Sequence, residues 1–96
     1  MTKMKLALFG DSHGIKQLSK YIPRKNIILI VASYKRPEYI SEIIQFSKEI
    51  SVPYLVQPKN DSNDYPCFLE EFSKYKIDLI WVNSYSVLIQ KDIINL

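Results

Sequence analysis

The chain has 96 residues, of which 47% are hydrophobic, and it carries a formal net charge of +3 at pH 7. This length accommodates at most one globular domain with a modest core, and the composition excludes an intrinsically disordered chain. The Lys and Arg residues are scattered along predicted helices and loops. This scatter argues against a nucleic-acid surface, but an anionic substrate is compatible with the charge balance.

The cysteine content and the apolar runs bear on the compartment. Cys67 is the single cysteine, so it cannot form an intrachain disulfide, and no Cys/His cluster has the spacing of a metal site. The longest apolar run, Ile27 to Ala32, is far shorter than the ~20 residues that span a bilayer. We therefore expect a cytoplasmic protein that has neither a membrane segment nor a metal site.

The first expected unit is a strand from Met4 to Phe9, then a loop over residues 10–14, then a helix that ends before Pro23. The loop, Gly10-Asp11-Ser12-His13-Gly14, lacks both the dinucleotide-binding fingerprint and the phosphate-loop motif. Two interpretations stay open. Either the loop lines a site for a small ligand or phosphate, or its glycines only permit a tight turn and close helix packing.

Two further strand and helix units are expected before the last strand. Ile27 to Ala32 is typical of a buried parallel strand, and Pro37 is expected to begin the helix that follows. Val52 to Val56 predicts a short third strand at a sheet edge, because Pro53 cannot donate a ladder hydrogen bond. Pro66 then opens a third helix. The apolar faces of the second and third helices comprise Ile40, Ile43, Ser47 and Ile50, and Phe68, Leu69, Phe72 and Tyr75.

The apolar run from Leu79 to Val82 predicts a fourth strand, buried and covered by helices on both faces. Right-handed crossovers place strand one between strands two and four, which gives the order 3-2-1-4. The predicted fold is therefore α/β, Rossmann-like and three-layered, with a mostly parallel sheet. Because ligands bind outside the carboxyl ends of such strands, Gly10 and Asn83 are expected to face one crevice.

Two stretches carry a resemblance to a known family. They are Leu8-Phe9-Gly10-Asp11-Ser12 and Asp78-Leu79-Ile80-Trp81-Val82-Asn83-Ser84-Tyr85-Ser86-Val87-Leu88-Ile89-Gln90-Lys91-Asp92-Ile93. Both resemble the N-terminal Rossmann-like part of formyltransferases that use 10-formyltetrahydrofolate, a family that includes sugar N-formyltransferases and methionyl-tRNA formyltransferase. Gln90 stands where that family usually has Pro.

The resemblance implies a role for the carboxyl end of strand four. In this family the backbone after that strand lies along the pterin of the folate donor, which implies a donor pocket formed here by Tyr85, Ser86, Val87, Leu88 and Ile89. The alternative is that Val87, Leu88 and Ile89 only close the end of the sheet. A substrate-binding role on the acceptor side is expected for Gly10, Asp11, Ser12 and His13 of the first loop, together with Asn83. For His13 in particular, the alternative is a solvated loop residue.

The resemblance also implies what this stretch lacks. The family's catalytic Asn, His and Asp lie beyond the position of Leu96, so none is assigned, and residues 1–96 are expected to be an N-terminal fragment that is inactive alone. The short Ser33–Pro37 loop favours an amino sugar on a nucleotide as the acceptor, while tRNA stays open. An unpaired flank on strand four leaves a homodimer open. A noncatalytic α/β module that binds a small ligand or nucleotide is the alternative function.

Overall fold

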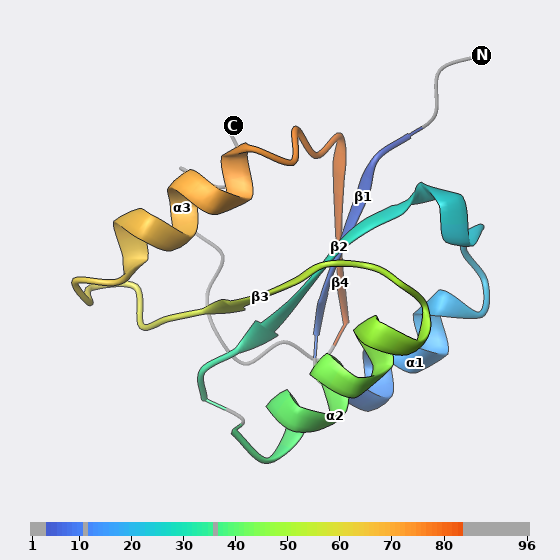
Figure 1. The fold of residues 1–96 in the computed structure, drawn as a ribbon, viewed down its shortest axis with the longest axis horizontal. Coiled ribbons are helices and arrows are strands. Elements are labelled where there is room, and N and C mark those ends of the chain that lie inside the picture. The colour runs from blue at the N-terminus through green and yellow to red at the C-terminus, as the bar shows by residue number, and fades with distance from the viewer. Residues whose placement is uncertain (1–3, 11, 36, 84–96) are drawn as a thin grey trace.

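The computed structural model describes residues 4–10, 12–35 and 37–83. Strands and helices alternate along these residues (Figure 1). In chain order the elements are β1 (Leu6–Gly10), α1 (Ser12–Ser19), the 3₁₀ helix η1 (Arg24–Asn26), β2 (Ile27–Ser33), α2 (Pro37–Glu49), β3 (Tyr54–Gln57), α3 (Tyr65–Ser73) and β4 (Leu79–Asn83).

The strands form one parallel sheet in the order β3-β2-β1-β4. Leu8 of β1 is the register partner of Ile30 in β2 on one side and of Trp81 in β4 on the other. The predicted order 3-2-1-4 is therefore confirmed, with β1 in the interior of the sheet. The apolar strands suit this position because parallel sheets are normally covered on both faces.

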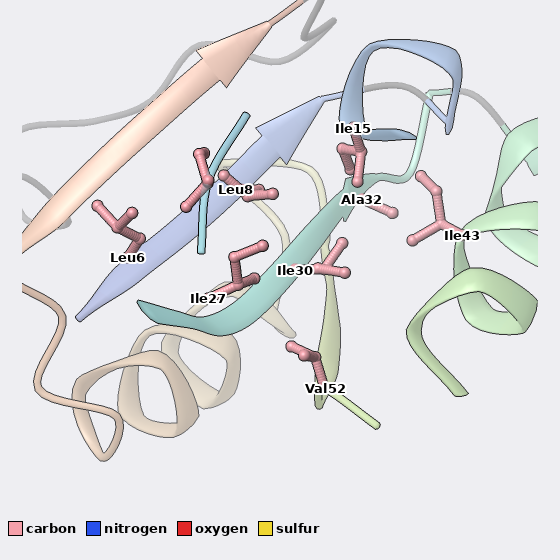
Figure 2. Packing of buried hydrophobic residues seen from close by; sticks show 9 residues of the cluster. Leu6, Leu8, Ile15, Ile27, Ile30, Ala32, Ile43 and Val52 are labelled. Atoms are coloured by element: carbon pink, nitrogen blue, oxygen red, sulfur yellow. The ribbon is translucent and has the colours of Figure 1, made fainter. Parts of the chain in front are cut away.

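Two hydrophobic clusters lie on opposite faces of the sheet, because successive side chains along a strand alternate between its faces. Leu6 and Leu8 of β1 belong to the first cluster with Ile15 of α1 and Ile43 of α2 (Figure 2). The second cluster contains Ala7, Phe9, Leu29, Val31, Tyr65, Phe68 and Phe72, so α3 covers the other face. The result is the predicted three-layer arrangement.

Helix α2 begins where its sequence predicts, at Pro37, and ends at Glu49 in a capping motif. Pro37 is its first residue, and Glu38 in the first turn complements the positive end of the helix dipole. At the other end the Val52 N–H donates to the Ser47 carbonyl at 2.9 Å, and the Ser51 N–H to the Lys48 carbonyl at 3.2 Å. With Ser51 at φ 58°, these bonds form a Schellman motif that turns the chain into β3.

The first connection differs from the predicted loop. Helix α1 already begins at Ser12, so His13 and Gly14 belong to a helix rather than to a loop. Neither Gly10 nor Gly14 has a positive φ angle, and Gly14 is buried. Close helix packing, which a side chain at Gly14 would oppose, therefore accounts for that residue better than a tight turn does. The helix also ends earlier than predicted, at Ser19.

Strand β4 is parallel, as predicted, but it is not covered on both faces. Leu79, Trp81 and Val82 have exposed fractions of 43%, 43% and 47%. Only Ile80 packs against a core cluster among the apolar residues of this strand. The prediction of a strand buried on both faces is therefore wrong within the described residues. Among the described residues, β4 lies at one edge of the sheet and pairs with β1 alone.

The third strand lies at the opposite edge, as predicted, but its limits differ. It runs from Tyr54 to Gln57, two residues after the predicted start at Val52. Pro53 precedes the strand, and its carbonyl accepts a hydrogen bond of 3.0 Å from the Ile30 N–H. Gln57, one residue after the predicted end at Val56, is the last residue of the strand and is fully buried.

Candidate functional site

The carboxyl ends of the strands gather polar and small residues along one edge of the sheet. Gly10 is the last residue of β1 and Asn83 the last residue of β4, and the two are register partners. Ser33 and Gln57 end β2 and β3 and are register partners in the same way. Because all four strands are parallel, these four ends lie on the same side of the molecule.

The Gly10–Asn83 pair lies where the direction of strand addition reverses. From β1 the chain moves outward to β2 and then β3, and β4 is added on the other flank of β1. In open α/β sheets this switch point leaves a crevice outside the carboxyl ends of the two strands, because the connections leave them on opposite faces. The expectation that Gly10 and Asn83 lie together is confirmed by their pairing.

Helix α1 contributes its N-terminus to the same edge. It begins at Ser12, two residues after the end of β1, and continues through His13. The first N–H groups of a helix have no partner within it, so they can donate to a ligand or to a cap. The backbone of Ser12 and His13 therefore lies next to the tip of β1, as the sequence predicted, although on a helix.

Ser33 and Gln57 are polar residues of this edge that the sequence analysis did not single out. Their exposed fractions are 1% and 0%. The Ser33 Oγ accepts a hydrogen bond of 3.0 Å from the Lys35 N–H, and the Gln57 Nε2 donates one of 3.0 Å to the Asn60 Oδ1. The Tyr34 N–H also donates to the Gln57 carbonyl at 3.0 Å. These bonds hold the loops after β2 and β3 against the strand ends.

A sequence signal could have found both residues. Each is the first polar residue after an apolar stretch, Ile27 to Ala32 for Ser33 and Leu55 to Val56 for Gln57. Such a residue ends a buried strand, so it lies at the carboxyl edge whenever the sheet is parallel.

The remaining predicted site residues are outside the described part of the chain. They are Asp11 in the first connection and the predicted folate-binding residues Tyr85, Ser86, Val87, Leu88 and Ile89. Their roles stay predictions. Over residues 4–10, 12–35 and 37–83, no group of three or more His, Cys, Asp and Glu side chains could hold a metal ion, and no helix is long and apolar enough to cross a membrane.

Comparison with known proteins identifies the fold. No family model matches the sequence, and no curated protein matches it either. Among solved structures, the chain is similar to phosphoribosylglycinamide formyltransferase from Streptococcus pneumoniae TIGR4, with a TM-score of 0.68 at 15% sequence identity. The similarity covers 96% of this chain. This chain has a formyltransferase fold.

The formyltransferase fold is represented here over part of its length. The chain spans about half of the solved structure that it matches, since the similarity covers 51% of that chain. The sheet order 3-2-1-4 and the flanking helices agree with the fold predicted from the strand and helix pattern. The fold of the solved formyltransferase agrees with the Rossmann-like fold that the resemblance in Leu8 to Ser12 and Asp78 to Ile93 implies. At 15% identity the similarity concerns the arrangement of the backbone. The chemistry of the site is argued from its residues.

Proposed function

We propose that this chain is the N-terminal, folate-donor side of an enzyme that transfers a formyl group from 10-formyltetrahydrofolate to an amine. The observation that carries the proposal is the pairing of Gly10 with Asn83 at the switch point of a sheet with a formyltransferase fold. The stretch predicted to bind the donor, Tyr85 to Ile89, begins two residues after Asn83 in sequence. The donor is thus proposed to bind next to the tip of β4.

The proposed reaction determines what the residues at the carboxyl edge of the sheet must do. The amine nitrogen forms a bond to the formyl carbon, the bond from that carbon to the donor nitrogen breaks, the amine loses a proton and the donor nitrogen gains one. Hydrogen-bond donors must stabilise the oxyanion formed on the way. In our proposal, the residues of this chain bind and orient the two substrates. Gly10 leaves room at the tip of β1 because it has no side chain, and backbone groups at the ends of β1 and β4 provide the polar contacts.

The acceptor is proposed to be an amino sugar carried on a nucleotide. The support is the short connection after β2, which ends at Ser33, while α2 begins at Pro37. Methionyl-tRNA formyltransferases typically carry a long basic insertion, and the connection from Ser33 to Pro37 is too short to contain one. The Ser33 and Gln57 hydrogen bonds keep this side of the edge ordered, so an acceptor would meet a preformed surface there.

We further propose that the enzyme works in the cytoplasm and that residues 1–96 alone bind the donor without transferring its formyl group. No catalytic residue is assigned within them. Purified protein should therefore produce no formylated product from 10-formyltetrahydrofolate and an amino sugar nucleotide. Formation of that product by this chain alone would contradict the proposed division between a donor-binding part and the catalytic groups.

Binding of a hydrolysis-resistant folate analogue tests the donor site directly. Trp81 is the only tryptophan and lies on β4, two residues before Asn83, so its fluorescence reports on this strand. We expect a saturable fluorescence change, with NMR shifts confined to the amides of Gly10, Asn83 and residues 85–89. Gly10→Val should weaken binding at least about tenfold, since a branched side chain would occupy the tip of β1.

The matched control is Ser33→Ala, which changes a strand tip away from the switch point. It should leave the affinity for the analogue within about twofold while the protein stays folded. Absence of any saturable change in the wild-type protein would overturn the donor site. If inorganic phosphate shifted only the amides of Ser12 to Gly14 and the folate analogue shifted none, the noncatalytic α/β binding module would be the better description.

A further inference from the structure

The positive charge of this protein is concentrated in one part of its sequence. From Ser12 to Pro37 there are six Lys and Arg residues and no Asp or Glu, which gives this stretch a net charge of +6. The whole chain carries +3, so the other residues carry a net charge of −3. Such an asymmetry is a recognised indication of an anionic partner. The Lys and Arg residues are therefore less evenly scattered than expected, because residues 12–37 carry an excess of positive charge.

Four of these cations are exposed and lie close together in the chain, on α1, on η1 and on the turn between them. Lys16 lies in the last turn of α1, Lys20 follows that helix, and Arg24 and Lys25 begin η1. All four are exposed, and Tyr21 lies between them in sequence. The segment forms the right-hand side of the molecule in Figure 1. We call Lys16, Lys20, Tyr21, Arg24 and Lys25 the basic surface.

The basic surface lies away from the candidate functional site. Helix α1 starts beside the carboxyl end of β1 and returns the chain to the other edge of the sheet. There η1 leads directly into Ile27, the first residue of β2 and the register partner of Leu6, the first residue of β1. The basic surface is therefore at the amino edge, opposite Gly10 and Asn83, and is independent of the proposed formyl transfer.

The cations of the basic surface are not neutralised within the described residues. None of the four forms an ion pair there, whereas Lys59 pairs with Asp61 at 3.8 Å and Lys74 with Glu71 at 2.9 Å elsewhere on the molecule. Four unpaired cations in ten residues repel one another, and an anionic partner would relieve that repulsion.

The aromatic side chain of the basic surface is unusually exposed and is attached to a fixed backbone. Tyr21 has an exposed fraction of 82%, while the neighbouring Ile22 and Ile27 are buried at 7% and 4%. The Asn26 N–H donates to the Pro23 carbonyl at 2.9 Å, which closes the turn between these two anchors. An aromatic ring held in solvent among cations can stack on an unpaired base.

We propose that the basic surface binds single-stranded nucleic acid, with Lys16, Lys20, Arg24 and Lys25 contacting phosphates and Tyr21 stacking on a base. A duplex would not offer an unstacked base to Tyr21. An anionic membrane is a poorer fit because insertion needs several apolar side chains, and Tyr21 is the one large apolar side chain exposed among the described residues of this surface.

Fluorescence anisotropy with labelled RNA and DNA strands of about ten nucleotides tests the proposal on the whole chain. Binding should weaken as the salt concentration rises. The triple variant Lys20→Gln, Arg24→Gln, Lys25→Gln should show a smaller dependence on salt. The slope of log binding constant against log salt concentration should fall in magnitude by about 2, at roughly 0.7 per phosphate contact. Tyr21→Ala should weaken binding roughly 5- to 150-fold, the range measured for loss of one stacked base.

The matched control replaces three cations on other parts of the molecule, Lys59→Gln, Lys74→Gln and Lys76→Gln, with the same change in net charge. It should leave the affinity within about twofold if the basic surface is specific. Equal losses in both triple variants would overturn the proposal, as would undetectable binding by folded wild-type protein. Stronger binding to duplexes, or binding only to vesicles of phosphatidylserine and phosphatidylcholine, would assign the surface to a different partner and also overturn it. Circular dichroism of each variant checks that the fold is kept.

Discussion

Gly10 and Asn83 are register partners at the carboxyl ends of adjacent parallel strands, although they come from opposite ends of the described chain. The pairing depends on β4 being added beside β1 rather than beside β3, which makes the space between β1 and β4 the switch point of the sheet. A site assembled in this way depends on a stable sheet. Several properties of the sheet and of its helices can be tested separately from ligand binding.

Phe72 anchors α3 to the sheet through an edge-to-face contact with Phe9, with ring centroids 5.8 Å apart. Both side chains are buried, at 2% and 0%. Phe72→Ala should lower the free energy of unfolding by about 3–5 kcal/mol, because it removes apolar contact and leaves a cavity. Urea denaturation measures this loss. As a control, Tyr21→Ala should change it by no more than about 0.5 kcal/mol, since that ring is 82% exposed. Similar losses in the two variants would contradict the α3 packing.

Ser51 closes the Schellman motif of α2 with φ 58°, a conformation that glycine adopts without steric cost. Ser51→Gly should raise the free energy of unfolding by about 0.5–1 kcal/mol. This is a net value, because the relief of the positive φ angle exceeds the loss caused by the greater freedom of glycine in the unfolded chain. Ser51→Val should lower it by about 1 kcal/mol or more, because a β-branched side chain crowds this backbone. Thermal unfolding of the two variants checks the opposite signs. A stabilised valine variant would be inconsistent with the motif.

Lys74, the C-cap residue of α3, forms an exposed pair with Glu71, and the hydrogen bond from Lys74 to Glu71 raises the pKa of the Lys74 amine. The pair favours folding while Lys74 is protonated, so its contribution is present at neutral pH and is lost as the pH rises through the raised pKa. NMR titration of the Lys74 side chain should show Glu71→Gln lowering this pKa. An unchanged pKa in that variant would show that Glu71 is not the cause.

The exposed side chains of β4 predict self-association. Leu79 and Trp81 project on one face and Val82 on the other, and β4 pairs with β1 alone within the described residues. An edge strand with exposed apolar side chains is a template for a second strand, and a second copy could supply it. Sedimentation velocity should show a dimer growing with concentration in the wild-type protein.

A charge on this strand should oppose that dimer. Val82→Lys places an ammonium group on β4 and should shift the equilibrium to monomer, while Tyr54→Lys on the opposite edge strand β3 should leave it unchanged. A monomer at every wild-type concentration, or equal effects of both substitutions, would rule out dimerisation through β4.

The residue pattern by itself determined the order of the elements and of the strands. Strands are predicted at Met4 to Phe9, Ile27 to Ala32 and Leu79 to Val82, and the structure has parallel strands there, the first from Leu6 to Gly10. Pro37 and Pro66 mark helix starts that the structure has within one residue. Chain connectivity and the handedness of crossovers then leave the order 3-2-1-4, which the structure confirms.

Only the tertiary structure decided which side chains are exposed and how the strands are in register. The apolar run that contains Leu79, Trp81 and Val82 predicts a strand covered on both faces, but these side chains are exposed. A run of apolar residues does not show whether other elements pack against the strand. The burial of Gln57 depends on β2 beside it, which the residues around Gln57 in the sequence do not reveal. Local preferences set which elements form, whereas the contacts between distant segments set which side chains remain available to a partner.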